Sequence, residues 1–139
     1  MINKKYLKLL RSKDRKYGEN FIYNEISKNI IDSLDILKVP FNNILELGIN
    51  DKLIINYLKQ RFRSCSIMSA DIDLSIFSKN TDRQLIEIDL DDIQIKDKKF
   101  DLIYSNFFCQ LTSNFDKLMK KYLSKPKFQW IFYCNDSKC

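Results

Sequence analysis

The sequence predicts an α/β fold built on a mostly parallel sheet of about five strands, with helices on both faces. Short apolar runs of strand length alternate with stretches whose apolar residues recur every three or four positions. Such alternation is typical of parallel strands joined by right-handed helical crossovers. The 139 residues, 45% of them hydrophobic, suffice for one core. We therefore expect a single domain over residues 1–139, with helices in residues 1–39 and the sheet in residues 40–139.

The first forty residues indicate two helices. A short basic helix is expected over Lys4–Lys16, and Gly18 ends it. Apolar residues then recur at helical spacing over Tyr23–Leu37 until Pro40 stops the second helix. The basic run carries much of the net charge of +6. A solvated helix face explains it most simply, and a docking surface for an acidic partner is the alternative. Nucleic acid is an unlikely partner, because no series of interleaved aromatic residues accompanies the run.

The most informative segment is the apolar strand Ile44–Ile49, which contains Glu46 and reaches Gly48 just before a helix. A carboxylate inside an apolar strand costs free energy, so Glu46 indicates a site. A strand, a glycine and the start of a helix form the nucleotide-sized pocket of open α/β sheets. Asn50 or Asp51 is expected to cap this helix. Its predicted apolar face comprises Leu53, Ile54, Tyr57 and Leu58.

Further strands are expected at Cys65–Ile72, Leu85–Leu90, Phe100–Ser105 and Phe128–Cys134. A weak helix is expected over residues 74–78, and a longer one over residues 115–123. Polar residues gather where four of the strands end, at positions 48–51, 71–73, 89–92 and 105–106. Because parallel sheets bind ligands beyond the carboxyl ends of their strands, these residues should converge on one site.

Several chemistries are excluded by composition. The chain has no histidine, so a Ser-His or Cys-His nucleophile is impossible. The spacing of its four cysteines fits no metal site, and we expect no bound metal. Reduced thiols in a cytoplasmic compartment are expected instead. No apolar run approaches membrane-spanning length, so no membrane association is expected. An organelle transit segment is the alternative interpretation of the basic amino terminus.

In their order and spacing, these motifs resemble the class I S-adenosylmethionine-dependent methyltransferases. Glu46-Leu47-Gly48 is similar to the start of the family's first motif, and Ala70-Asp71-Ile72 to the end of its second strand. Ile88-Asp89 and Phe100-Asp101-Leu102 follow the spacing of its third and fourth strands. Ser105-Asn106 followed by Gln110-Leu111 resembles the type 11 group, which includes malonyl-acyl-carrier-protein O-methyltransferases of biotin synthesis and a related mitochondrial complex I assembly factor. The resemblance covers nearly the whole chain and implies a Rossmann-like methyltransferase sheet.

The resemblance implies S-adenosylmethionine as the cofactor and a role for individual residues. Gly48 would admit the methionine portion, with Glu46 organising the loop and the cofactor amine. Asp71 would accept hydrogen bonds from the ribose hydroxyls, and Asp89 from the adenine amino group. The expected cofactor-binding set is Glu46, Gly48, Asn50, Asp71, Ile72, Asp89, Leu90, Ser105 and Asn106. No catalytic residue is assigned, because transfer to an existing carboxylate needs positioning and desolvation rather than a general catalyst.

The sequence departs from the family pattern in the glycine loop and towards its end. Asn50 and Lys52 stand where the family has its second and third glycines, and Leu111 replaces a tryptophan. Lys52 would either clash with the cofactor or pair with its carboxylate. The family's last two strands are expected to be lacking. Two functions stay open: methyl transfer to a small-molecule or acyl-carrier carboxylate, with an acidic partner such as an acyl carrier protein, and a catalytically inactive binding or assembly protein. A nucleic-acid-binding domain is supported by charge alone.

Overall fold

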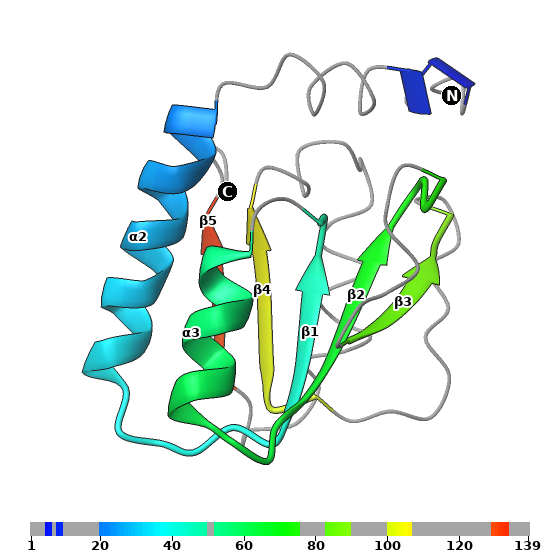
Figure 1. Cartoon of the computed structure of the whole chain (residues 1–139). Helices are drawn as coiled ribbons and strands as arrows, with labels where there is room; N and C mark the ends of the chain where they lie inside the picture. Colours follow the sequence, from blue (N-terminus) through cyan, green and yellow to red (C-terminus); the bar gives the residue numbers. More distant parts are fainter. Residues whose placement is uncertain are drawn as a thin grey trace.

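The computed structural model describes residues 5, 6, 8, 9, 20–49, 52–75, 83–89, 100–106 and 129–133. Within them, five parallel strands form one sheet in the order β3-β2-β1-β4-β5 (Figure 1). The strands are β1 Asn43–Leu47, β2 Ser66–Asp71, β3 Gln84–Glu87, β4 Leu102–Asn106 and β5 Gln129–Tyr133. The prediction of a parallel α/β sheet with about five strands is confirmed.

The strand order reverses in the middle of the sheet. Along the chain, β2 and β3 are added on one side of β1, whereas β4 and β5 are added on its other side. The crossover connections therefore diverge between β1 and β4, which is where open α/β sheets bind ligands. Gly48 follows β1 directly, and Ser105 lies near the end of β4. The topology thus places two of the expected cofactor-binding residues at the switch point.

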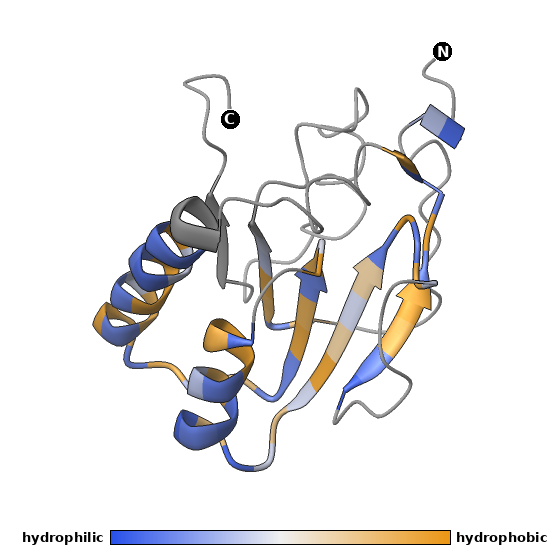
Figure 2. Ribbon diagram, turned by 45° about the horizontal axis from the view of Figure 1, so that its top comes forward, coloured by the Kyte–Doolittle hydropathy of each residue, from blue (hydrophilic) through white to orange (hydrophobic). Residues whose placement is uncertain are grey.

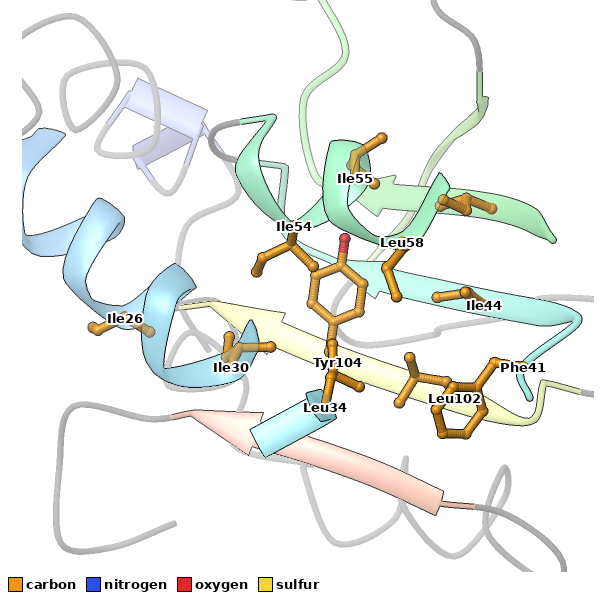
Figure 3. Packing of buried hydrophobic residues seen from close by; sticks show 11 residues of the cluster. Ile26, Ile30, Leu34, Phe41, Ile44, Ile54, Ile55, Leu58, Leu102 and Tyr104 are labelled. Carbon is orange, nitrogen blue, oxygen red and sulfur yellow. The ribbon is translucent and has the colours of Figure 1, made fainter. Parts of the chain in front are cut away.

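Two described helices, α2 (Asn20–Ile36) and α3 (Leu53–Arg61), cover the same face of the sheet (Figure 1). In Figure 2 both helices carry hydrophilic residues beside hydrophobic ones, as expected of helices that pack on one side. Their inward side chains join residues of β1, β2 and β4 in one core (Figure 3). Burial of each large aliphatic side chain stabilises the fold by about 1.5–3 kcal/mol. The helix predicted over residues 115–123 lies outside the described residues.

The start of α3 differs from the prediction. Its N-cap is Lys52, without a side-chain capping bond, rather than Asn50 or Asp51. Leu53, predicted on the apolar face, is 40% exposed, and Ile55 is buried instead. The reason is that the helix turns Ile54, Ile55 and Leu58 towards the sheet and uses Tyr57 to contact α2.

Arg61 joins the two helices. Its guanidinium donates to the carbonyl oxygens of Leu34 and Leu37 at the end of α2, and to the hydroxyl of Tyr57 at 2.7 Å. It also lies 5.0 Å from the ring centroid of Phe62. Carbonyl groups at a helix end lack the N–H donors of a following turn, so a cation there adds a hydrogen bond to them and complements the helix dipole. Arg61 thereby holds α2 against α3 over the core.

Asp101 fixes the amino-terminal edge of the sheet. Its carboxylate accepts the backbone N–H of Asn42 at 2.8 Å and of Asn43 at 2.9 Å. The N–H of Asp101 in turn donates to the carbonyl of Asn43 at 2.9 Å. These bonds hold the start of β1 beside β4. The aspartate of the Phe100-Asp101-Leu102 motif therefore has a structural role at the edge opposite the expected site.

Candidate functional site

The turn after β1 depends on Gly48. Its φ is 85°, a left-handed conformation that residues with a Cβ avoid. The Gly48 N–H donates to the carbonyl of Ala70 at 2.8 Å, so the turn is bonded to β2. At the other end of the turn, Lys52 is exposed and has φ −94° and ψ 2°, which any residue can adopt. The backbone at position 52 therefore does not need the glycine that the family pattern places there. Asn50 lies outside the described residues.

Asp71 ends β2, and none of its surface is exposed. One carboxylate oxygen accepts the N–H of Ile49 at 2.8 Å, and the other accepts the N–H of Ile72 at 2.8 Å. The carbonyl of Asp71 accepts the N–H of Ile88 at 2.8 Å. Asp71 therefore connects the residues that follow β1, β2 and β3. The ribose contact that the resemblance implies for Asp71 stays a prediction.

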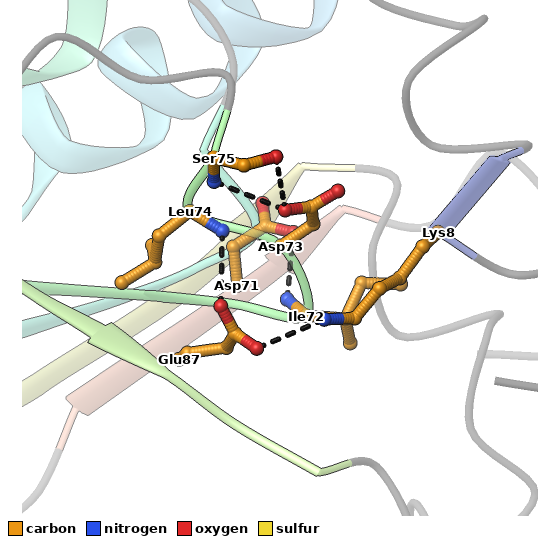
Figure 4. Close-up of polar contacts among 7 residues, drawn as sticks. All are labelled: Lys8, Asp71, Ile72, Asp73, Leu74, Ser75 and Glu87. Carbon is orange, nitrogen blue, oxygen red and sulfur yellow. Dashed lines mark hydrogen bonds and ion pairs between the residues drawn. The ribbon is translucent and has the colours of Figure 1, made fainter. Parts of the chain in front are cut away.

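Two further carboxylates lie beside Asp71 at the same edge (Figure 4). Asp73 accepts the N–H of Ser75 at 3.0 Å and its hydroxyl at 2.6 Å. Glu87, at the end of β3, accepts from Lys8 at 2.9 Å and from the N–H of Leu74 at 3.4 Å. Sequence reasoning did not assign Glu87 or Lys8 to the site. The predicted strand Leu85–Leu90 placed Glu87 in its interior, whereas β3 ends at Glu87, so no sequence signal pointed to a position at the strand end.

The Lys8–Glu87 pair brings helical residues of the amino-terminal segment to this edge. The side chains are 42% and 49% exposed, so the pair is solvated. The hydrogen bond to Glu87 raises the pKa of Lys8, slight burial opposes it, and the negative charges of Glu87 and Asp73 add to the increase. An exposed ion pair contributes about 0–1 kcal/mol. The contact therefore holds the segment at this edge only weakly.

Glu46 finds its partners inside the protein. Arg83 donates to one carboxylate oxygen at 3.1 Å, and the hydroxyl of Tyr104 donates to the other at 2.7 Å. The side chains of Arg83 and Glu46 are 6% and 4% exposed. A buried cation thus accounts for the carboxylate inside an apolar strand. Sequence reasoning missed Arg83, because a single arginine before a short strand gives no periodic signal. The contact of Glu46 with the cofactor amine stays a prediction.

Ser105 places a buried hydroxyl near the carboxyl end of β4. Its oxygen has no hydrogen-bond partner in the part of the chain that the structure describes, and the same holds for Ser69 within β2. A buried hydroxyl left unpaired costs about 1–3 kcal/mol, so a partner from a ligand at Ser105 would stabilise the fold. Ile72, Asp89 and Asn106 also lie at strand ends on this edge. Leu90 lies outside the described residues.

Within the described ranges, no group of three or more histidine, cysteine, aspartate or glutamate side chains is arranged to hold a metal ion. Likewise, no helix within these ranges is both long and apolar enough to cross a membrane. Cys65 is a free thiol whose pKa is raised mainly by burial.

The sheet order β3-β2-β1-β4-β5 belongs to the fold of the class I S-adenosylmethionine-dependent methyltransferases, as solved structures of that fold show. One similar structure is the plantazolicin methyltransferase BpumL, crystallised in complex with a pentazolic desmethylPZN analog and S-adenosylhomocysteine (SAH). Its TM-score is 0.61 at 15% sequence identity, and the match covers 94% of this chain and 54% of BpumL. A S-adenosylmethionine-dependent methyltransferase from Clostridium acetobutylicum ATCC 824 has a TM-score of 0.59 at 20% identity, covering 91% of this chain and 56% of that protein. The chain thus spans about half the length of these structures.

One curated protein is similar to this chain in sequence. Ribosomal RNA small subunit methyltransferase A of Malacoplasma penetrans (strain HF-2) is 31% identical over 96 residues, covering 52% of this chain and 35% of the relative. The chain therefore spans about one third of that protein's length. No protein-family model matches the chain. Membership of the type 11 group stays a prediction.

Proposed function

We propose that this chain binds S-adenosylmethionine at the carboxyl edge of β1, β2 and β4 and transfers a methyl group to RNA. The main support for cofactor binding is the left-handed turn at Gly48, which is hydrogen-bonded to β2 at the topological switch point of the sheet. When bound, this cofactor supplies a methyl group activated by a sulfonium. Structures of the same fold in complex with SAH support the choice.

The residues at this edge fit such a ligand. Gly48 has no Cβ, so the backbone of the turn leaves room for close approach. Asp73 and Glu87 offer carboxylate oxygens of the kind that accept hydrogen bonds from ribose hydroxyls. The hydroxyl of Ser105 is buried where the resemblance puts the floor beneath the sulfonium. Lys52 is exposed and its backbone angles suit any residue, so a lysine is compatible with the backbone at this position.

RNA is the acceptor that the sequence relative and the charge favour together. The relative's name assigns it to small-subunit ribosomal RNA. The net charge of +6 favours a polyanion, and Lys8 places part of the basic run beside the site. The missing aromatic residues argue against stacking on single-stranded bases, but contacts to phosphates do not require them.

A carboxylate on a small molecule or on an acyl carrier protein is the second candidate. It follows from the type 11 resemblance, and the same basic residues would attract an acidic carrier. A cytoplasmic location belongs to either proposal and is supported by the free thiol of Cys65. Transfer of a labelled methyl group to small-subunit ribosomal RNA or to malonyl-acyl-carrier protein distinguishes the two acceptors.

Calorimetric titration with S-adenosylmethionine and SAH tests cofactor binding directly. We expect micromolar dissociation constants, and no binding at millimolar ligand would overturn the proposal. Ser105→Ala should weaken SAH about 2–10-fold, because one hydrogen bond is lost. Ser69→Ala is the matched control, since its hydroxyl is equally buried and unpaired but lies within β2. Intact SAH binding without transfer to either acceptor would favour an inactive binding or assembly protein.

A further inference from the structure

We infer that Asp71 positions the loop after β1, and that the carboxylate recognising the ribose hydroxyls in this chain is Asp73. The inference rests on the proposed function, because it concerns how the same cofactor is held. It changes the assignment that the resemblance implies, in which Asp71 itself contacts the ribose. The burial and bonding of the two aspartates carry it.

Asp71 has no surface to offer a ligand. Its residue exposure is 0%, and its two carboxylate oxygens each lie 2.8 Å from a backbone nitrogen, one in Ile49 and one in Ile72. A carboxylate has about four lone-pair positions, but a hydroxyl must reach one of them to donate. With both oxygens covered and both hydrogen-bonded to the main chain, Asp71 acts on its neighbours rather than on a ligand.

The neighbours that Asp71 holds belong to the cofactor loop. Gly48 and Ile49 bond through consecutive N–H groups to the last two residues of β2: the first to the carbonyl of Ala70, the second to the carboxylate of Asp71. The second bond is charge-assisted and therefore the stronger of the two. Since Gly48 is in the left-handed conformation, these bonds set the direction in which the loop leaves β1. Loss of the carboxylate would release the loop that faces the methionine portion.

Asp73 is the next carboxylate along the chain and retains accessible surface. One of its oxygens accepts both the N–H and the hydroxyl of Ser75, at 3.0 and 2.6 Å. These two bonds hold the carboxylate in one orientation at the end of β2 (Figure 4). A preoriented acceptor binds hydroxyls without a further ordering cost.

Titrations with three ligands, followed by calorimetry or NMR, separate the two roles. The first ligand is SAH. The second is adenosine, which keeps the ribose but lacks the amino acid, and the third is 2′,3′-dideoxyadenosine, which also lacks the two ribose hydroxyls. Asp71→Asn should weaken SAH about tenfold and leave adenosine within about twofold, because it disturbs the loop only. Asp73→Asn should weaken SAH and adenosine alike, about tenfold, and leave dideoxyadenosine unchanged. Asp101→Asn is the matched control, since Asp101 also accepts two backbone N–H groups but lies at the opposite edge.

The inference is overturned if Asp71→Asn weakens adenosine but not dideoxyadenosine, which would make Asp71 the ribose acceptor. It is also overturned if Asp73→Asn leaves the preference for adenosine over dideoxyadenosine intact. If Asp71→Asn does not fold, the Asp73→Asn titrations alone test the inference. Wild-type protein that binds neither SAH nor adenosine would instead refute the proposed function, and this inference with it.

Discussion

Replacement of Glu46 by glutamine should destabilise the protein severely. The change keeps the shape of the side chain but removes the negative charge that lies 3.1 Å from the guanidinium of Arg83, which is 6% exposed. It also removes one of two acceptor oxygens, which now serve Arg83 at 3.1 Å and Tyr104 at 2.7 Å. Breaking a buried ion pair on one side costs about 3–5 kcal/mol. Because a domain of this size has a total stability of about 5–15 kcal/mol, the loss is a large share of it.

Urea denaturation followed by far-UV circular dichroism measures this loss. Glu87→Gln is the matched control: it breaks an ion pair of similar length, 2.9 Å, whose side chains are 42% and 49% exposed, and should cost below about 1 kcal/mol. The double variant Glu46→Leu with Arg83→Leu should recover most of the loss, because apolar side chains replace buried ion pairs at little cost. A cost for Glu46→Gln below about 1 kcal/mol, equal to that of the control, would refute the reasoning.

Three further outcomes are expected. Arg61→Lys should cost about 1–2 kcal/mol in urea denaturation, because one ammonium group cannot reach the carbonyls of Leu34 and Leu37 and the hydroxyl of Tyr57 at once. The same change at the exposed Arg63 should cost less than half of that. The stabilisation from the Lys8–Glu87 pair should be fully present below pH 10.5 and be lost as pH rises through the raised pKa of Lys8. In an NMR titration, Glu87→Gln should bring the pKa of Lys8 back towards 10.5, and an unchanged pKa would contradict the contact. Cys65, whose pKa is raised mainly by burial, should react with iodoacetamide several-fold more slowly in the native than in the urea-unfolded protein, and equal rates would contradict its burial.

The parallel sheet and the convergence of strand ends were predictable from sequence, because both depend on local signals. The apolar run that became β1 and the glycine after it are adjacent residues, and alternation with helices constrains the strands to be parallel. Every predicted strand end differs from the observed one by one to three residues, since hydrogen bonding between strands decides where each strand stops. For α3, the period indicated a helix but not its rotation, so Leu53 was placed wrongly on the buried face.

By itself, the sequence determined the order of strands and helices, the glycine turn and the clustering of polar residues at one edge. Only the tertiary structure decided what each polar residue does. Glu46 meets Arg83 across 37 positions, and Lys8 meets Glu87 across 79, so neither partner leaves a pattern in its own neighbourhood. Tertiary packing also decided that Asp71 is buried against the loop after β1, whereas Asp73, two residues on, keeps accessible surface. Local periodicity specifies which segments become strands, whereas the environment of a carboxylate depends on which distant segments pack around it.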